Sequence, residues 1–260
     1  MTKYHFTADR KLALGSQLLQ RLVISEIHSG GKPSASIPDL SSIPIVKNEK
    51  SGRPSYSPPP ATEGQIWELK DYNVSHHNSR SPSLPCLVVL VARVAPPSTG
   101  RQRVGVDVVP DAYNRSESAQ TFLESFRSSG VFTDYEIGII FSPLRNEEKV
   151  KMLYLHWALK EAYVKAVGTG LVTNLLAIEF RGVNLHDTED RAYDGVEVYV
   201  DGEKRSEWKL EVGRLSRGHY FAVAADGRDG GDGGEGDIGG WRWIEFRKDI
   251  WDVWSEPMVN

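Results

Sequence analysis

The segment from Asn146 to Leu171 carries the longest uninterrupted helical pattern in this 260-residue chain. Glu147 and Glu148 lie in its first turn, where negative charge is favourable to the helix dipole. Small and apolar residues recur at helical spacing and predict a buried face: Leu155, Ala158, Ala162 and Ala166. No proline interrupts the segment, and Gly168 is a typical helix stop. The pattern therefore predicts one long helix with one side turned towards a core.

Three polar or aromatic side chains share another face of this helix. Trp157, Glu161 and Lys165 are spaced four residues apart, so they are neighbours on the helix surface. Such an alignment occurs in solvated helices without any function. The alternative interpretation is that these side chains form part of a functional site, and residues earlier in the chain help to decide between the two.

The segment Gly105–Pro110 reads as a short buried strand with one carboxylate, that of Asp107. Burial of a carboxylate is costly unless it is paired or bound to a metal ion. Asp107 and Glu161 would together offer two oxygen ligands to Mg²⁺, which often takes one or two carboxylates plus phosphate and water. Lys165, one turn beyond Glu161, could then reach a phosphate.

The GVDVV sequence at 105–109, followed by W-x-x-K-E-A-x-x-K-x-x-G-x-G-L, resembles the 4′-phosphopantetheinyl transferases. The similarity is to the larger, monomeric surfactin-type class that includes fungal enzymes, and it covers about residues 7 to 225. The second motif is formed by Trp157, Lys160, Glu161, Ala162, Lys165, Gly168, Gly170 and Leu171. The resemblance implies an α+β fold of two pseudo-symmetric αβ halves, each a long helix packed on a small antiparallel sheet.

This resemblance and the composition divide the chain into four parts. Residues 1–103 would form the N-terminal half and residues 104–225 the C-terminal half with the metal site. The acidic, glycine-rich residues 226–240 predict a flexible loop, because they cannot bury apolar surface. Residues 241–260 form an aromatic C-terminal segment, whose tryptophans would dock on the core if ordered.

A second helical pattern spans residues 7 to 28 and carries basic residues at its start. By resemblance, Arg10 and Lys11 would hold the 3′-phosphate of coenzyme A, whereas a solvated helix end is the other interpretation. The family usually has a strand ahead of this helix, so we expect an N-terminally shortened half. A truncated chain, a wrong start codon and a decayed copy all remain open.

Two further segments match the family between these helices. The run Ser51–Pro54 resembles G-[KR]-P, and by that resemblance Arg53 would approach a phosphate of coenzyme A; a solvated turn arginine is the alternative. The run Asp71–His76 matches F-N-x-S-H with tyrosine in place of phenylalanine. Ser75 and His76 could donate hydrogen bonds to phosphate oxygens.

The chain departs from the family pattern at two places. Val109 stands where bacterial surfactin-type relatives carry a third acid, which leaves the third metal ligand open. The pair at 141–142 matches the family's F-S, but Arg145 stands where a glutamate would follow. Whether Glu147 or Glu148 replaces that glutamate is open.

Beyond the long helix, alternating apolar residues predict an antiparallel sheet. The Asp201-Gly202 pair predicts a hairpin turn between two of its strands. The predicted strands are residues 177–181, 196–200, 208–212 and 220–224.

Composition excludes several classes of protein. The formal net charge is −4, so no general attraction to nucleic acid or membranes is expected. Cys86 is the only cysteine, which excludes an intrachain disulfide and favours a reducing, cytoplasmic setting. The sequence contains no apolar run near the length of a membrane-spanning helix, and its start has no apolar signal core.

The resulting hypothesis is a Mg²⁺-dependent holo-carrier-protein synthase. It would move 4′-phosphopantetheine from coenzyme A to a serine of an acyl or peptidyl carrier protein, and would act as a monomer. Asp107 and Glu161 would hold the metal, Glu161 or a water would assist deprotonation of the serine, and Lys165 would bind the pyrophosphate. The alternatives are a non-catalytic or decayed coenzyme A-binding relative and an unrelated α+β binding domain.

Overall fold

The structure is a computed structural model of the chain. It describes residues 6–28, 43–49, 52–56, 68–78, 86–113, 115–142, 145–170, 173–185, 189, 192–216, 218–226 and 242–244. The helices are α1 (Thr7–His28), α2 (Ala119–Arg127), α3 (Asp134–Ile140), α4 (Asn146–Val167) and the short 3₁₀ helix η3 (Leu175–Ala177). The strands are β1 (Ile45–Lys47), β2 (Pro54–Tyr56), β3 (Glu68–His77), β4 (Leu87–Ala95), β5 (Val104–Pro110), β6 (Ile178–Arg181), β7 (Ala192–Tyr193), β8 (Glu197–Val200), β9 (Glu203–Lys204), β10 (Trp208–Leu215) and β11 (His219–Asp226).

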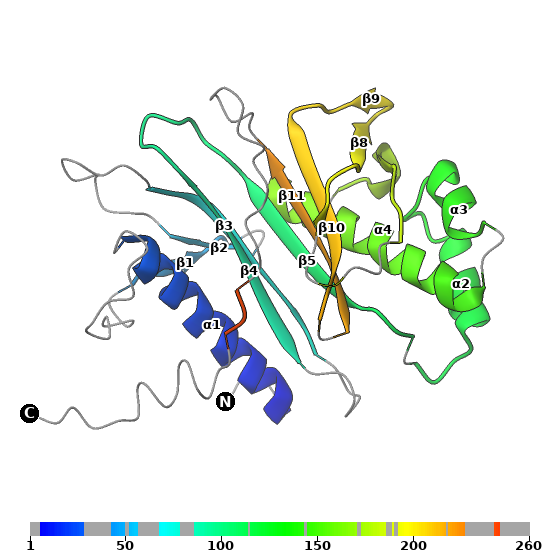
Figure 1. Ribbon diagram of the computed structural model, residues 1–260, viewed down its shortest axis with the longest axis horizontal. Coiled ribbons are helices and arrows are strands. Elements are labelled where there is room, and N and C mark those ends of the chain that lie inside the picture. Colours follow the sequence, from blue (N-terminus) through cyan, green and yellow to red (C-terminus); the bar gives the residue numbers. More distant parts are fainter. Residues whose placement is uncertain are drawn as a thin grey trace, which may run out of the picture.

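The N-terminal half is the helix α1 packed alongside the antiparallel pair β3–β4 (Figure 1). Its core is small and consists of Ile24 from α1 with Leu69 and Tyr72 from β3. Asp9 lies in the first turn of α1, as expected for an acid near the positive end of the helix dipole. The helical pattern of residues 7 to 28 is thus confirmed.

The C-terminal half is an antiparallel sheet in the order β5-β11-β10-β7, with α4 packed on one face (Figure 1). Val109 on β5 and Val212 on β10 face α4 and belong to the largest core. The alternate residues of β5, including Val106 and Val108, face the other way and pack with β4. This alternation follows from the two-residue period of a strand and places a core on each face of β5.

Helix α4 has nearly the predicted bounds and ends at Gly168, whose φ of 82° forms the left-handed cap. It is buried on more sides than a surface helix because α2, α3 and β6 also pack against it. The outer sheet β6-β8-β9 turns at Asp201-Gly202, where both residues have positive φ, so the predicted turn is present. The strand after this turn is β9, whereas the predicted strand 208–212 belongs to β10 and pairs with β11 and β7 in the other sheet.

The predicted α+β class is confirmed by these two helix-on-sheet halves. The boundaries assigned to the four parts of the chain stay a prediction. Residues 227–240 and most of residues 241–260 lie outside the described residues, so the predicted flexible loop and aromatic segment do as well. No helix within the described ranges is long and apolar enough to cross a membrane.

A buried ion pair fixes α4 against its neighbours. The Lys160 Nζ lies 2.8 Å from Glu136 Oε2 and donates to the Ile178 carbonyl at 2.5 Å. Glu136 also accepts from the backbone N–H groups of Thr133 and Phe180 at 2.9 and 3.0 Å. Burial raises the pKa of Glu136 and lowers that of Lys160, and each charge opposes the shift of the other. The pair joins α3, α4 and β6 immediately beside Glu161.

Changing Glu136 to glutamine should lower the free energy of unfolding by about 3–5 kcal/mol, because it leaves a buried ammonium without its counter-charge. Denaturant titration measures this loss. The matched control is Glu124→Gln, since Glu124 pairs with Arg127 on the surface, and it should cost less than about 1 kcal/mol. Equal losses in the two variants would contradict a buried charge pair.

The buried His156 predicts a dependence of stability on pH. Its Nδ1 lies 2.9 Å from the Met152 carbonyl, and burial lowers its pKa from 6.5 to about 4. The unfolded chain therefore binds more protons between these values, so stability should fall as pH drops through this window, by about 3 kcal/mol in total. Unfolding titrations from pH 7 to pH 4 test this. A His156→Leu variant should lose that part of the pH dependence, and an unchanged slope would refute the assignment.

Candidate active site

The centre of the candidate site is the carboxylate of Asp107, which faces α4 from β5. Its Oδ1 accepts a hydrogen bond from Ser75 Oγ at 2.7 Å and lies 2.6 Å from Lys165 Nζ. Lys165 also donates to Ser75 Oγ at 3.1 Å and to the Val106 carbonyl at 3.2 Å. Only 7% of Asp107 is exposed, so the charge is buried but paired. Three predicted residues from β3, β5 and α4 are thus in direct contact.

Glu161 lies close enough to Asp107 to respond to its charge. Burial raises the pKa of Glu161, the Asp107 carboxylate raises it further, and the Lys165 ammonium opposes both. Two carboxylates that repel each other in this way are stabilised by a cation between them. Their oxygen donors fit the preference of Mg²⁺, so Asp107 and Glu161 are the residues that would hold it.

The third acid of bacterial relatives has no equivalent at position 109. Val109 is 7% exposed and packs in the α4-side core, on the same face of β5 as Asp107. Among the described residues, no three acidic, histidine or cysteine side chains gather as a metal cluster would. Within the described part of the chain, the acids assigned to this position are therefore Asp107 and Glu161. Glu148, one of the two acids considered as a replacement, caps α4 instead and accepts from the Arg145 N–H at 3.0 Å.

His76 extends the site from the end of β3 towards the start of α1. Its side chain is exposed, and desolvation followed by the Lys165 ammonium lowers its pKa, while Asp107 and Asp9 raise it. Asn78 donates to Asp9 Oδ1 at 2.5 Å, which ties β3 to the first turn of α1.

Arg10 and Lys11 follow Asp9 on α1, and both are exposed. They therefore lie on the turn of α1 that reaches the end of β3. Their assignment to a nucleotide phosphate stays a prediction.

Arg53 lies elsewhere in the seam between the halves. Its guanidinium donates to the Lys165 carbonyl and to Asp71 Oδ2, both at 2.5 Å. Its side chain is 18% exposed. The role of Arg53 in phosphate binding stays a prediction.

Sequence reasoning missed the side chains that hold the free edge of β5. The N–H of Val104 donates to Asp71 Oδ2 at 2.8 Å, and that of Val106 donates to Asn73 Oδ1 at 2.9 Å. Asp71, Asn73 and Ser75 alternate along β3, so all three project from the same side. The F-N-x-S-H motif predicts roles for Ser75 and His76 only, and it indicates no role for Asp71 or Asn73.

A second missed feature concerns the expected F-S-x-x-E spacing. The F-S pair lies at 141–142, but Phe132 and Thr133 precede Glu136 with the spacing that the family glutamate would have. Thr133 and Glu136 form a capping box at the start of α3, and Glu136 is the partner of Lys160. Glu136 thus stands at the spacing from Phe132 and Thr133 that Arg145 has from Phe141 and Ser142.

A histidine pair borders the site. His77 Nδ1 lies 2.9 Å from His219 Nε2, which joins the end of β3 to the start of β11. His219 is fully buried, and burial lowers the pKa of His77. At this distance one ring must donate and the other accept. The pair is a further link between the two halves that no sequence motif indicated.

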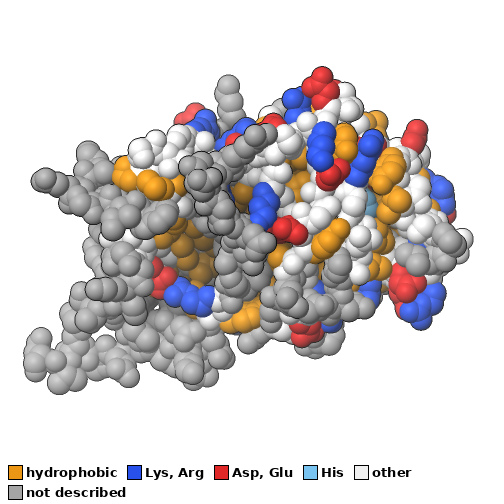
Figure 2. All heavy atoms as spheres, turned by 45° about the horizontal axis from the view of Figure 1, so that its top comes forward, with side chains coloured by type: hydrophobic (Ala, Val, Ile, Leu, Met, Phe, Trp, Pro, Cys, Tyr) orange, Lys and Arg blue, Asp and Glu red, His pale blue; other side chains and the backbone are white. Residues whose placement is uncertain are grey.

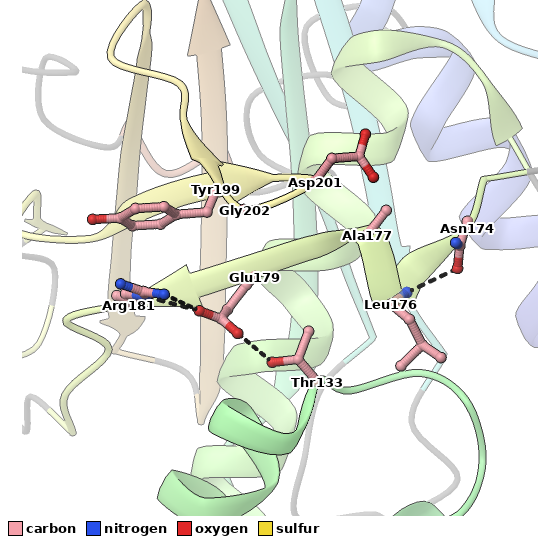
Figure 3. A pocket seen from close by; sticks show the side chains of 9 residues that line it. All are labelled: Thr133, Asn174, Leu176, Ala177, Glu179, Arg181, Tyr199, Asp201 and Gly202. Carbon is pink, nitrogen blue, oxygen red and sulfur yellow. Dashed lines mark hydrogen bonds and ion pairs between the residues drawn. The ribbon is translucent and has the colours of Figure 1, made fainter.

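A separate pocket lies at the outer sheet, away from these residues. Figure 3 shows Glu179 between Arg181 and Thr133, with Tyr199 and Asp201 at the opposite wall. None of the predicted site residues lines it. On the face drawn in Figure 2, basic, acidic and apolar side chains are interspersed over the described residues.

Comparison with known proteins identifies the family. Residues 103–224 match the family model described as the 4′-phosphopantetheinyl transferase superfamily. The L-aminoadipate-semialdehyde dehydrogenase-phosphopantetheinyl transferase of Schizosaccharomyces pombe is 31% identical over 239 residues, covering 85% of this chain and 78% of the relative. The chain belongs to the 4′-phosphopantetheinyl transferase superfamily.

Other members of the superfamily show the same relation at lower identity. The 4′-phosphopantetheinyl transferase NpgA of Emericella nidulans is 28% identical, over 86% of this chain and 73% of its own length. The Xenopus laevis relative, also named for L-aminoadipate-semialdehyde dehydrogenase, is 28% identical over 85% of this chain. The chain spans 64% of the length of that relative and 63% of the human one.

Proposed function

We propose that this chain transfers the 4′-phosphopantetheine arm of coenzyme A to a serine hydroxyl of a carrier protein, with Mg²⁺. The observation that carries the proposal is the contact of Ser75, Asp107 and Lys165. These residues come from three motifs distant in sequence, and they meet at the seam between the halves. Membership of the superfamily supports the same reaction.

The chemistry is a phosphoryl-group displacement. The carrier serine Oγ attacks the phosphorus that bears pantetheine, the P–O bond to the adenosine side breaks, and 3′,5′-adenosine bisphosphate leaves. The serine proton passes to Glu161 or to a water, and the raised pKa of Glu161 suits a base. Bound by Asp107 and Glu161, Mg²⁺ would supply Lewis-acid stabilisation of the pyrophosphate.

The cationic side chains of the site have complementary roles. Lys165 would bind the pyrophosphate and oppose the charge that builds up on the leaving group. Arg10, Lys11 and His76 would bind the nucleotide end, and Ser75 would join them by turning its one O–H from Asp107 to a phosphate oxygen. His76→Ala should therefore weaken coenzyme A binding more than it slows a saturated reaction.

The class of acceptor protein is likewise a proposal, which the names of the relatives suggest. Two of the relatives above are named for L-aminoadipate-semialdehyde dehydrogenase, so a carrier domain of such a dehydrogenase is one acceptor to test. Acyl and peptidyl carrier proteins of fatty acid, polyketide or peptide synthesis are the others. We propose a cytoplasmic monomer that acts on these proteins without nucleic acid or membrane.

The direct experiment incubates the protein with coenzyme A, Mg²⁺ and several apo carrier proteins. Mass spectrometry should show one phosphopantetheine arm added to a carrier. Glu161→Gln should stop the reaction, because the amide keeps the shape but loses the charge that binds the metal.

A second outcome would favour the non-catalytic alternative. The apolar packing of Val109, where bacterial relatives have an acid, is the observation behind it. Coenzyme A binding without transfer to any carrier, also in a version extended at its N-terminus, would support a binding protein.

A further inference from the structure

Arg53 occupies the point where α4, β3 and β5 meet. It directly precedes β2, and its two terminal nitrogens face five acceptors from these three elements. An arginine has five N–H donors, of which four are on these two nitrogens. The acceptors are the carbonyls of Lys165 (2.5 Å), Ala166 (3.2 Å), Tyr72 (3.3 Å) and Val104 (2.8 Å) and the carboxylate of Asp71 (2.5 Å).

Two of these contacts cap the end of α4. Lys165 and Ala166 lie in the last turn of the helix, where carbonyl groups have no partner within the helix. A positive charge at this end is also favourable to the helix dipole. Arg53 therefore holds the backbone of the residue whose side chain reaches Asp107.

The other contacts hold the start of β5. The Val104 carbonyl accepts from Arg53, while the Val104 N–H donates to Asp71, which itself pairs with Arg53. A β-bulge between Leu69 and Asp71 changes the register of β3 immediately before Asp71. Arg53 and Asp71 together replace the missing neighbour strand at this edge, three residues before Asp107.

We propose that Arg53 is a positioning residue, which sets the spacing between Lys165 on α4 and Asp107 on β5, and that it does not bind a phosphate of coenzyme A. This inference rests on the proposed function and departs from the role that the G-[KR]-P resemblance implies. A phosphate could recruit the terminal nitrogens only by breaking the cap of α4 or the pair with Asp71. The Asp71 carboxylate also neutralises the charge that a phosphate would seek.

The test separates turnover from binding in two variants, Arg53→Met and Asp71→Asn. A positioning role predicts that each lowers kcat, by about 100-fold for a misplacement near 1 Å, and changes the Kd for coenzyme A less than about threefold. The double variant should fall no further than the single ones, because the two residues act as a unit. Calorimetry with coenzyme A gives Kd, and carrier modification gives kcat.

A phosphate ligand predicts the opposite pattern. Arg53→Met would then raise the Kd by about tenfold or more, through loss of a charge-assisted hydrogen bond. Asp71→Asn would lower the Kd, since it removes an acid beside the bound anion. Either result overturns the proposal. If Arg53→Met does not fold, the Kd of Asp71→Asn alone decides by its direction.

Failure of the proposed function would look different. A wild-type protein that binds coenzyme A but modifies no carrier would contradict transfer, and the Kd comparison would still decide between positioning and phosphate binding. Arg10→Ala is the matched control, because it removes a basic residue that we place at the nucleotide. It should raise the Kd, which is the change that the positioning role excludes for Arg53→Met.

Discussion

Replacing Asp107 with asparagine should lower transfer to a carrier protein by about 10³-fold while the protein stays folded. The amide can still accept from Ser75 and Lys165, so the contacts survive, but the negative charge that binds the metal is lost. The loss of stability should stay near 1–2 kcal/mol. Steady-state modification of a carrier gives the activity, and circular dichroism with thermal unfolding gives the fold.

The matched control for this change is Asp111→Asn. Asp111 lies just beyond β5 and pairs with Arg214 at 2.7 Å. Asp107 and Lys165 act on the pKa of Glu161, and Asp111 is not among the causes. It should keep normal transfer. If Asp107→Asn also keeps near-normal transfer, Asp107 does not hold the metal.

Gly105→Ala should have the second large effect, because β5 touches α4 there. A Cβ on Gly105 would lie 2.0 Å from the Ala162 carbonyl oxygen and 2.6 Å from the Ala166 nitrogen. These are backbone atoms of a buried helix and cannot rotate away, so α4 must shift from β5. Overpacking of this kind costs roughly 3 kcal/mol, and a shift near 1 Å should cost about 100-fold in transfer. Unfolding titrations and carrier modification measure the two effects.

The control for steric change is Gly138→Ala. Gly138 lies in α3, where an added Cβ would meet no atom within 4 Å. Alanine is also the better helix former, so this variant should be as stable as the parent or more so. A Gly105→Ala protein that behaved like it would show that β5 and α4 are not in the contact described.

Only those parts of the site that depend on local sequence patterns could be predicted, because contacts between residues far apart in the chain leave no local pattern. The bounds of α1 and α4 follow from local periodicity and from Gly168, so the patterns predicted them closely. Asp107 was indicated by its place in an apolar strand. Arg53 and Lys165 are more than a hundred residues apart, and no local pattern encodes their contact.

The buried partner of Lys160 shows a different difficulty. The W-x-x-K-E-A motif identifies Lys160. The F-S pair at 141–142 predicts a glutamate at position 145, beyond the end of α3, where the chain has arginine. The glutamate that pairs with Lys160 is Glu136, three residues after Phe132-Thr133. Short motifs recur by chance, and only the fold shows which copy faces the lysine.

The most direct test of the account follows both products of one reaction. The protein, coenzyme A, Mg²⁺ and an apo carrier are mixed, and the 3′,5′-adenosine bisphosphate released is quantified beside the holo carrier. We expect equal amounts of the two, with the arm on a single serine of the carrier, and neither product from Glu161→Gln. Nucleotide release without a modified serine, or equal yields from the wild type and Glu161→Gln, would contradict a transferase site built on Asp107, Glu161 and Lys165.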